Sequence, residues 1–337
     1  MKVIYDLSEL PNFGCVLSLG KFESIHKGHQ QLIKEVAETT TDIIDGREDL
    51  IQELGENMAI VASAIMIFDP HPYTVLDKKS GYKPLFSVPE REHILNSLAE
   101  SGQIPKIDYL IVQPFNKEFS EISPDDFCIW LFNKAWSVIV GEGYRFGRGR
   151  EGTTEVLQLW ASALGSGSFA IKHHASNALG GKISTSRIRE LLAANKFAEA
   201  HSLLGFNFFV MGIVTRGKQL GRTIGIPTLN IYPPSDKFLP ANGVYVTRTH
   251  INGVIYKSIT NIGIRPTVTN TNGVNTADSI SVETHLLDFH NNENESYGQS
   301  IKVEFLHFIR PEQRFPNLAA LQSQIATDIK FTQAFHQ

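Results

Sequence analysis

The stretch GKFESIHKGHQ, residues 20–30, places two histidines around one glycine where an apolar run gives way to a helical pattern. Residues three apart share one face of a helical turn, so His26 and His29 can act together. A helix N-terminus offers N–H groups to an anion, and Gly28 removes a side chain from its approach. The pattern fits donation to charge growing on phosphate oxygens. Two solvent-facing histidines at a helix start are the alternative, and these four residues leave the choice open.

A second polar set, ISTSRIRE, precedes another helical pattern near residues 183–190. We expect Ser184, Thr185 and Ser186 to lie before a helix whose first residue is Arg187. Hydroxyls and a guanidinium at a helix start suit phosphate binding. A simple serine N-cap is the alternative, which this segment alone favours. Two helix starts of this kind at one sheet edge would strengthen the phosphate interpretation.

The segment GKQLGRTIGIPTLN, residues 217–230, is a glycine-rich loop. It is not a Walker A loop, because no Lys-Ser/Thr pair follows the required glycine spacing. Gly217, Gly221 and Gly225 would still let the chain wrap closely around phosphates. On an extended segment Thr228 and Asn230 point to one side, so their oxygens can share Mg²⁺. A plain turn-rich connection is the alternative.

Glu283 is the candidate proton acceptor, in the segment SISVETHLLDF. Strand alternation puts Glu283 and His285 on one face and the mainly apolar residues on the other. A carboxylate on the inner or rim face of a barrel can take a proton from a substrate hydroxyl. Periodicity alone favours the alternative, a solvated outward residue.

Elements that would position these residues follow two patterns. Before residue 186, continuous apolar runs at 14–20, 59–68, 108–113 and 136–142 alternate with helical segments at 29–38, 89–101, 124–135 and 153–164. Such runs predict an α/β doubly wound fold with a parallel sheet covered on both faces. Its carboxyl ends share one edge, where ligands bind at the switch in strand order. The polar segment 39–57 is expected to extend the first crossover at the surface.

The remaining chain has a different texture. A helix is expected at 186–204, followed by short strands and turns from 206 to 310. Asn252-Gly253 between two alternating runs predicts a hairpin. So many short strands need closed edges, which predicts a small barrel or closed sandwich. Residues 311–335 are predicted to form a terminal helix packed on it.

Composition limits the classes of protein. The 337 residues carry a net charge of −4 and 42% apolar residues, with a pI near 6.3, which argues against a dedicated nucleic-acid or membrane-surface binder. Cys15 and Cys128 lie in apolar runs, as buried thiols in a reducing compartment do. Without a signal-peptide pattern or an apolar run of about eighteen residues, we expect a cytoplasmic protein.

The motifs of the first part resemble a known family, in its order: LGKFESIHKGHQ, FDPHP, PFNKEFSEISPDDF, VGEGYRFGRG and ISTSRIRELL. They are similar to the adenylyltransferase half of the bacterial bifunctional riboflavin kinase/FAD synthetases, in the H-x-G-H nucleotidyltransferase superfamily. The resemblance implies that His26 and His29 handle the ATP phosphates during attack by the FMN phosphate. Arg187, with Ser184 to Ser186, would hold the departing pyrophosphate. Further nucleotide-binding positions would be Gly20, Phe22 and Gly28, and the flavin would be bordered by Pro70, His71 and Pro72.

The second part resembles the flavokinase module throughout, in GRTIGIPTLN, LPANGVY, NIGIRPT, VETHLLDF and VEFLHFIRPEQRF. The resemblance implies that Thr228 and Asn230 bind Mg-ATP and that Glu283 is the base on the ribityl 5′-hydroxyl of riboflavin. Arg265 would line the flavin. The loop over the ATP phosphates would include Gly217, Lys218, Gly221 and Arg222.

Four departures from the family pattern lie in the first part. Lys21, Glu23 and Ser24 stand in GKFESIH where the family usually has G-N-F-D-G-V-H, and Gly143 stands where Asn or Asp is common. If the backbone at Ser24 needs positive φ, losing the family glycine costs about 1 kcal/mol. Glu23 could displace a helix cap or a nucleotide contact.

The sequence therefore predicts an FMN adenylyltransferase domain at 1–186, a connecting helix at 187–204 and a riboflavin kinase domain at 205–337. Mg²⁺ would act with ATP, FMN and FAD would be substrate or product, and no structural metal is expected. The predicted partners are small molecules, without nucleic acid or membrane. Two alternatives stay open: a riboflavin kinase with an impaired or repurposed adenylyltransferase domain, and a flavin-binding protein without turnover.

Overall fold

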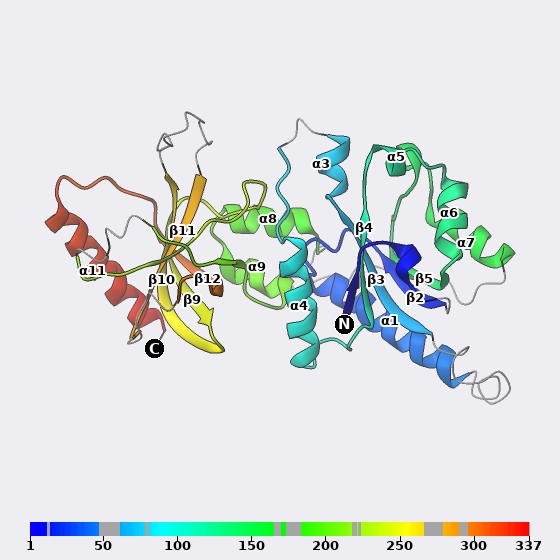
Figure 1. Cartoon of the computed structure of the whole chain (residues 1–337), viewed down its shortest axis with the longest axis horizontal. Helices are drawn as coiled ribbons and strands as arrows, with labels where there is room; N and C mark the ends of the chain where they lie inside the picture. The colour runs from blue at the N-terminus through cyan, green and yellow to red at the C-terminus, as the bar shows by residue number, and fades with distance from the viewer. Residues whose placement is uncertain are drawn as a thin grey trace. The chain divides into compact units, whose positions relative to one another are not determined.

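The computed structural model describes residues 1–11, 14–46, 61–77, 81–164, 170–172, 183–217, 221, 224–265, 279–289 and 296–336. The chain divides into two compact units, Met1–Thr185 and Ser186–Gln337 (Figure 1). Residues 47–57 of the polar segment and residues 270–278 lie outside the described part. No helix in the described ranges has the length and apolar character needed to cross a bilayer.

The first unit contains a six-stranded parallel sheet in the order β1-β4-β3-β2-β5-β6. Its strands are β1 (Lys2–Ile4), β2 (Cys15–Leu19), β3 (Ala62–Asp69), β4 (Tyr109–Pro114), β5 (Ala135–Gly141) and β6 (Ala170–Lys172). Strands β3 and β4 follow on one side of β2 and β5 and β6 on the other, so strand order reverses beside β2. This confirms the predicted doubly wound fold, and the reversal marks the loop after β2 as the ligand edge. The short edge strands β1 and β6 were not predicted.

Helices connect these strands and begin at side-chain caps. They are α1 (Lys27–Asp45), α3 (Pro72–Leu76), α4 (Val88–Glu100), α5 (Lys117–Ser120), α6 (Pro124–Phe132) and α7 (Thr154–Ala163). Ser87 and Glu90 form a reciprocal capping box at α4, and Ser123 caps α6. Such caps satisfy N–H groups that have no partner within the helix. Helix α1 extends to Asp45, so part of the segment predicted as a surface extension is helical.

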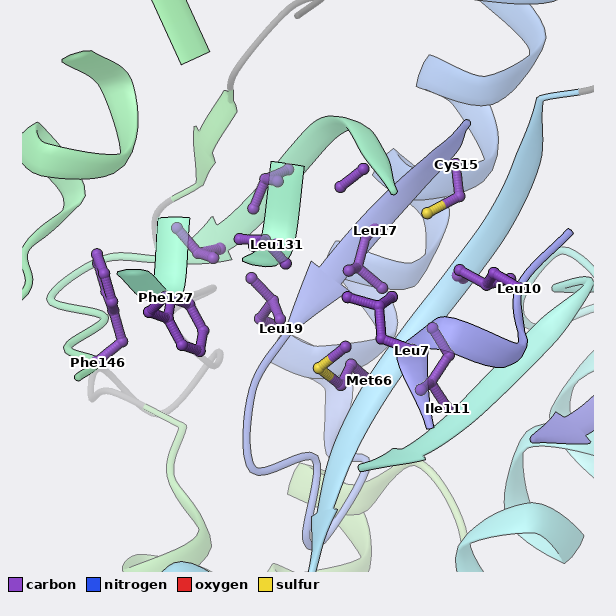
Figure 2. Packing of buried hydrophobic residues seen from close by; sticks show 14 of the residues in the cluster. Leu7, Leu10, Cys15, Leu17, Leu19, Met66, Ile111, Phe127, Leu131 and Phe146 are labelled. Atoms are coloured by element: carbon purple, nitrogen blue, oxygen red, sulfur yellow. The ribbon is translucent and has the colours of Figure 1, made fainter. Parts of the chain in front are cut away.

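The core of the first unit lies on the strands beside the switch. All five residues of β2 are buried. Figure 2 shows Leu17 and Leu19 of β2 and Met66 of β3 grouped with Phe127 and Leu131 of α6. Burial of each such side chain stabilises the folded state by roughly 1.5–3 kcal/mol relative to leaving it exposed. This packing fixes β2, and therefore the loop that follows it.

The helix predicted at 186–204 is instead two helices, α8 (Thr185–Ala193) and α9 (Phe197–Leu204). Asn195 between them has φ +59°. The N–H of Lys196 donates to Leu191 O and the N–H of Asn195 to Leu192 O. These two bonds form a Schellman motif, which ends a helix at a left-handed residue. The prediction of one continuous helix over 186–204 was therefore wrong, because the first helix ends before Asn195.

The second unit is built on six antiparallel strands in the order β7-β12-β9-β10-β11-β8. They are β7 (Phe209–Ile213), β8 (Leu229–Ile231), β9 (Gly243–Ile251), β10 (Val254–Arg265), β11 (Ser279–Leu286) and β12 (Ser300–Arg310). The N–H of Thr215 donates to Asn230 O at 2.8 Å and brings the chain after β7 to β8. The sheet thus forms a nearly closed barrel, as predicted. Asn252-Gly253 makes the predicted β9–β10 hairpin with positive φ at both residues.

Helix α11 (Leu318–Phe335) packs against β10, as predicted for the terminal helix, although it begins later than expected (Figure 1). Asn317 caps its first turn. Asp328, 2% exposed, accepts from Arg310 Nη2 at 2.7 Å. The paired charge ties the helix to the end of β12, because a buried carboxylate needs such a partner.

A closed ring of hydroxyl contacts lies in the barrel interior. It joins five fully buried side chains over distances of 2.7–3.1 Å. Its members are Thr247, Thr249, Ser258, Thr260 and Thr284. Each hydroxyl can donate once and accept once, so the ring satisfies all five. It links β9, β10 and β11 and fixes Thr284, the neighbour of Glu283.

Candidate active sites

The two histidines of the first unit stack on each other at the start of α1. His26 is the N-cap residue, and its Nδ1 accepts from the backbone N–H of His29 at 3.2 Å. The two ring centroids are 3.7 Å apart with planes 5° apart. His26 is 2% exposed, whereas His29 is partly exposed. The pair therefore sits at a helix N-terminus on the ligand edge, where an anion is stabilised.

Hydrogen bonding assigns the proton on His26. Since Nδ1 accepts from a backbone N–H, the neutral ring carries its proton on Nε2. An Nε2–H group is a donor, which is what a phosphate oxygen requires. The cap thus prepares His26 for the chemistry that the sequence suggested.

The ring of Phe22 packs against His29 of the histidine pair. Its side chain is 1% exposed and its ring centroid lies 4.9 Å from that of His29. A Cβ at Gly20 would come within 3.0 Å of the Phe22 ring, so the turn favours glycine there. Both residues were predicted to bind nucleotide. The buried Phe22 ring packs against His29, and nucleotide binding by Gly20 and Phe22 stays a prediction.

Ser24 does not carry the expected backbone strain. Positive φ occurs at Phe22 (40°) and Ile25 (45°), on either side of it. Ser24 Oγ lies 2.9 Å from Thr185 Oγ1. Ser24, in place of the family glycine, therefore adds a hydrogen bond to the start of α8. Its own φ is not positive, so the strain energy considered for this substitution does not arise.

Helix α8 begins two residues earlier than predicted. Thr185 is its first residue and Arg187 its third, with Ser184 just before it. Ser184 and Thr185 are partly buried and Ser186 is exposed. Through the Ser24 contact, this helix start lies beside the loop that follows β2. Thr185, the first residue of α8, therefore lies beside the loop that leads into α1, as the predicted phosphate site requires.

The predicted flavin border, Pro70 to Pro72, enters helix α3. His71 is 4% exposed and caps the helix, its Nδ1 accepting from the N–H of Tyr73 at 3.3 Å. Lys21 Nζ lies 3.9 Å from the Tyr73 ring centroid. Hydrogen bonding and charge from Lys21 lower the pKa of Tyr73. Lys21 therefore contacts the predicted flavin border.

Gly143 fits a tight turn after β5. Its φ is +73°, and no neighbouring atom lies within 4 Å of an added Cβ. Asparagine and aspartate tolerate such a conformation better than most residues. The backbone conformation is thus compatible with both this glycine and the family residues.

In the second unit, strand register brings the candidate base to the candidate metal ligand. Glu283 of β11 pairs directly with Asn230 of β8. Directly opposed residues on antiparallel strands point to the same face. The Asn230 Nδ2 donates to Thr228 O at 3.2 Å and lies 3.5 Å from Thr228 Oγ1. Three predicted residues therefore share one small surface.

Two glycines of the loop, Gly217 and Gly221, lie close to neighbouring atoms. A Cβ at Gly217 would lie 2.6 Å from the Asn230 amide, and one at Gly221 would lie 2.1 Å from Ile226 O. Ile226 N–H donates to Gly221 O at 2.8 Å. Glycine at both positions leaves room for close backbone approach. The predicted contacts of Lys218, Arg222 and the Arg265 side chain lie outside the described residues.

Sequence reasoning placed His285 beside Glu283 without giving it a role. His285 Nδ1 lies 2.7 Å from Pro227 O, so it donates to that carbonyl. The contact ties β11 to the segment that carries Thr228. Ser281 Oγ, two residues before Glu283, donates to its carboxylate at 3.3 Å. Alternation along β11 places Ser281 and His285 on the same face as Glu283. Which residues they contact depends on how the strands pair.

Oxygen donors at Thr228 and Asn230 suit a hard cation such as Mg²⁺. With its amide nitrogen turned toward Thr228, Asn230 retains Oδ1 as the atom that can bind a cation. Glycine at 217 leaves the neighbouring space clear. The residues therefore fit an ATP-bound cation. Among the described residues, no group of three His, Cys, Asp or Glu side chains could hold a metal.

Two protein families match successive parts of this chain. Residues 9–187 match the family described as FAD synthetase, and residues 204–336 match the family described as riboflavin kinase. The chain is thus a transferase that joins these two modules. Members of these families use ATP and a divalent cation.

Two bifunctional relatives match this chain over nearly their whole length. A bifunctional riboflavin kinase/FMN adenylyltransferase of Escherichia coli strain K12 is 34% identical, covering 96% of this chain and 94% of the relative. One from Listeria monocytogenes is 30% identical and covers 99% and 98%. A Streptococcus pneumoniae crystal structure, described as a macrolide-efflux protein, matches with TM-score 0.75, 25% identity and 98% of each chain. The chain belongs to the bifunctional riboflavin kinase/FMN adenylyltransferase family.

Proposed function

We propose that the chain makes FMN and then FAD. In the second unit, ATP would phosphorylate riboflavin to give FMN and ADP. In the first, the FMN phosphate would attack a second ATP to give FAD and pyrophosphate. The observation that carries this proposal is the direct pairing of Glu283 with Asn230, whose amide lies against Gly217. The stacked histidines at the ligand edge support the second reaction.

Glu283 is the proposed base for the kinase reaction. It accepts the proton of the ribityl 5′-hydroxyl while the oxygen attacks the γ-phosphorus of ATP. Thr228 and Asn230 would hold Mg²⁺ with ATP, which when bound neutralises charge on the phosphate oxygens. Gly217 to Arg222 would cover the phosphates, and Arg265 would line the flavin. Pairing with Asn230 keeps the base beside the nucleotide.

His26 and His29 are the proposed hydrogen-bond donors to the ATP phosphates during adenylyl transfer. The Nε2–H of His26 would donate to ATP phosphate oxygens as negative charge shifts toward pyrophosphate. Arg187, with Ser184 to Ser186, would hold the pyrophosphate. Gly20, Phe22 and Gly28 would bind the nucleotide, and Pro70, His71 and Pro72 would border the flavin. Neither reaction needs a covalent enzyme intermediate.

We also propose domain boundaries and a compartment. The adenylyltransferase domain would span 1–186 and the kinase domain 205–337, with 187–204 connecting them. Riboflavin, FMN and ATP would be the partners, without nucleic acid or membrane. Cys15 and Cys128 are buried free thiols, which fits work in the reducing cytoplasm.

Incubation of the purified full-length chain with riboflavin, ATP and Mg²⁺, followed by chromatographic separation of flavins, tests the proposal. We expect FMN first and FAD later. No FMN under varied redox and metal conditions would contradict it. FMN without FAD, even from added FMN, would select the impaired-adenylyltransferase alternative. Tight flavin binding without ATP consumption would select the non-catalytic one.

A further inference from the structure

Glu23 is a buried carboxylate in the loop between β2 and α1, at the first unit's ligand edge. It is 1% exposed. Its Oε1 accepts from the backbone N–H of Leu85 at 2.9 Å, and its Oε2 accepts from the Tyr82 hydroxyl. His71 Nε2 lies 3.5 Å from the same Oε2. The loop after β2 is thereby tied to two segments far along the chain.

Arg91 balances the charge of this cluster. It is 3% exposed, and its Nη1 donates to Lys21 O at 3.4 Å. Burial lowers the pKa of Arg91, while the carboxylates of Asp69, Glu23 and Glu90 act in the opposite direction. A buried ionised carboxylate is costly unless it is paired and hydrogen-bonded. Glu23 is hydrogen-bonded by Leu85 and Tyr82 and interacts electrostatically with Arg91.

The contact with Glu23 orients His71. Since His71 Nδ1 accepts from the N–H of Tyr73, its neutral ring carries the proton on Nε2, which faces the Glu23 carboxylate. A carboxylate beyond the second ring nitrogen fixes both tautomer and ring orientation. Glu23 therefore acts through His71 on the cap of α3.

Three rings extend this support to the surface. His71 stacks on Tyr82 with centroids 4.6 Å apart, and Tyr73 lies 5.4 Å from His71 and 5.3 Å from Tyr82. His71 is buried, whereas Tyr73 is 41% exposed. Glu23 binds two of these rings and so sets the position of the third.

We propose that Glu23 is a positioning residue for flavin in the first unit. It holds His71 and Tyr82 so that Pro70 to Tyr73 present a fixed face to the isoalloxazine ring of FMN. The inference rests on the proposed adenylyltransferase function. An aspartate, one methylene shorter, would withdraw the carboxylate from these partners. The effect falls on FMN, because the ATP phosphates are assigned to His26 and His29.

A double-mutant cycle on the full-length chain tests the inference. Glu23→Gln removes the charge, and His71→Asn removes Nε2 while keeping an acceptor for the α3 cap. Each single change is expected to raise KM for FMN about tenfold and leave KM for ATP within about twofold, and the double variant should stay within about twofold of the weaker-binding single variant. Glu38→Gln, on the exposed side of α1, is the matched control.

Calorimetric titration with FMN in the absence of ATP gives a second measurement. Glu23→Gln should weaken one flavin site and leave the kinase-unit site unchanged. An unchanged KM and affinity for FMN, additive effects in the cycle, or equal rises in KM for both substrates would overturn the inference. If Glu23→Gln fails to fold, Tyr82→Phe, which removes one hydroxyl, serves in its place with the same criteria. Absence of FAD from the unaltered chain would contradict the proposed function, while the titration would still decide the role of Glu23.

Discussion

At the residue scale, the proposed chemistry depends on where a side chain is held. Glu283 faces Asn230 across two strands, and Thr284 beside it belongs to the buried hydroxyl ring. His285 joins the same strand to Pro227. These anchors hold the carboxylate near the candidate cation ligands Thr228 and Asn230, as the proposed general-base catalysis would require.

Replacement of Glu283 by Gln is expected to lower the rate of FMN formation by roughly 10²–10⁴-fold, because the amide cannot accept the hydroxyl proton. KM for ATP should change little, since Thr228 and Asn230 remain. Steady-state assays with each substrate varied will measure both. Asp236→Asn, an exposed change in the same unit, is the control. A rate near that of the unaltered chain would exclude Glu283 as the base.

The two cysteines are expected to be unreactive in the folded chain. Burial raises the pKa of Cys15 to about 12 and that of Cys128 to about 12. At pH 8 only about one thiol in ten thousand would be ionised, and the thiolate is the reactive form. A chromogenic disulfide reagent should detect no thiol in the native chain and both after denaturation. Rapid native labelling would contradict this.

At the element scale, a polar cluster joins β12 to β9, and α9 packs against β12. Glu304 lies 3.0 Å from His250 Nε2 and 2.9 Å from Lys302 Nζ. Burial alone would raise the pKa of Glu304, but hydrogen bonds and charge from His250 and Lys302 outweigh it and lower the pKa to about 2. Burial lowers the pKa of His201 to about 4, against the smaller effect of Glu304. The second unit therefore has two groups that resist protonation.

His201 should make this unit sensitive to mild acid. Its ordinary pKa is 6.5, so the unfolded chain binds the proton first, and stability present above that value is lost as pH falls toward about 4. Between pH 7 and pH 5 the loss should be about 2 kcal/mol. Glu304 contributes below this window, because its stabilisation is lost as pH falls from 4.5 to about 2.

Urea unfolding at both pH values measures this loss. Circular dichroism follows the whole chain, and fluorescence separately follows the first unit, which holds all three tryptophans, Trp130, Trp136 and Trp160. His201→Phe should remove most of the pH dependence in the second unit. Ser202→Ala on the same helix should retain it. Equal dependence in both variants would exclude His201 as the source.

At the scale of the whole molecule, two modules with separate sheets share one chain. The FAD synthetase match ends at residue 187 and the riboflavin kinase match begins at 204. Each module contains its own candidate site on its own sheet. The two proposed reactions should therefore respond independently to changes in either site.

His29→Ala is expected to abolish FAD formation and leave FMN formation unchanged. The substitution removes a proposed hydrogen-bond donor to the ATP phosphates and the ring that stacks on His26. With FMN supplied, Glu283→Gln should still form FAD. Flavin separation after timed incubation measures both products in one sample. Loss of both activities in either variant, with folding intact, would contradict two independent sites.

Sequence by itself determined the fold class and the residues of interest. Continuous apolar runs predicted the parallel sheet, Asn252-Gly253 predicted the hairpin, and the family motifs identified His26, His29 and Glu283 as candidates. These signals are local, because hydrophobic period and turn chemistry act within a few residues. The break at Asn195 was missed because asparagine carries a weaker C-cap signal than glycine.

Tertiary structure alone decided how these residues meet. Alternation put Glu283 on one face of its strand, but only pairing with β8 placed Asn230 opposite it. Glu23 was a departure from a motif until folding brought His71, Tyr82 and Leu85 to its carboxylate. Register and buried polar contacts depend on partners far apart in the chain, and the free energy that selects them comes from packing the whole module.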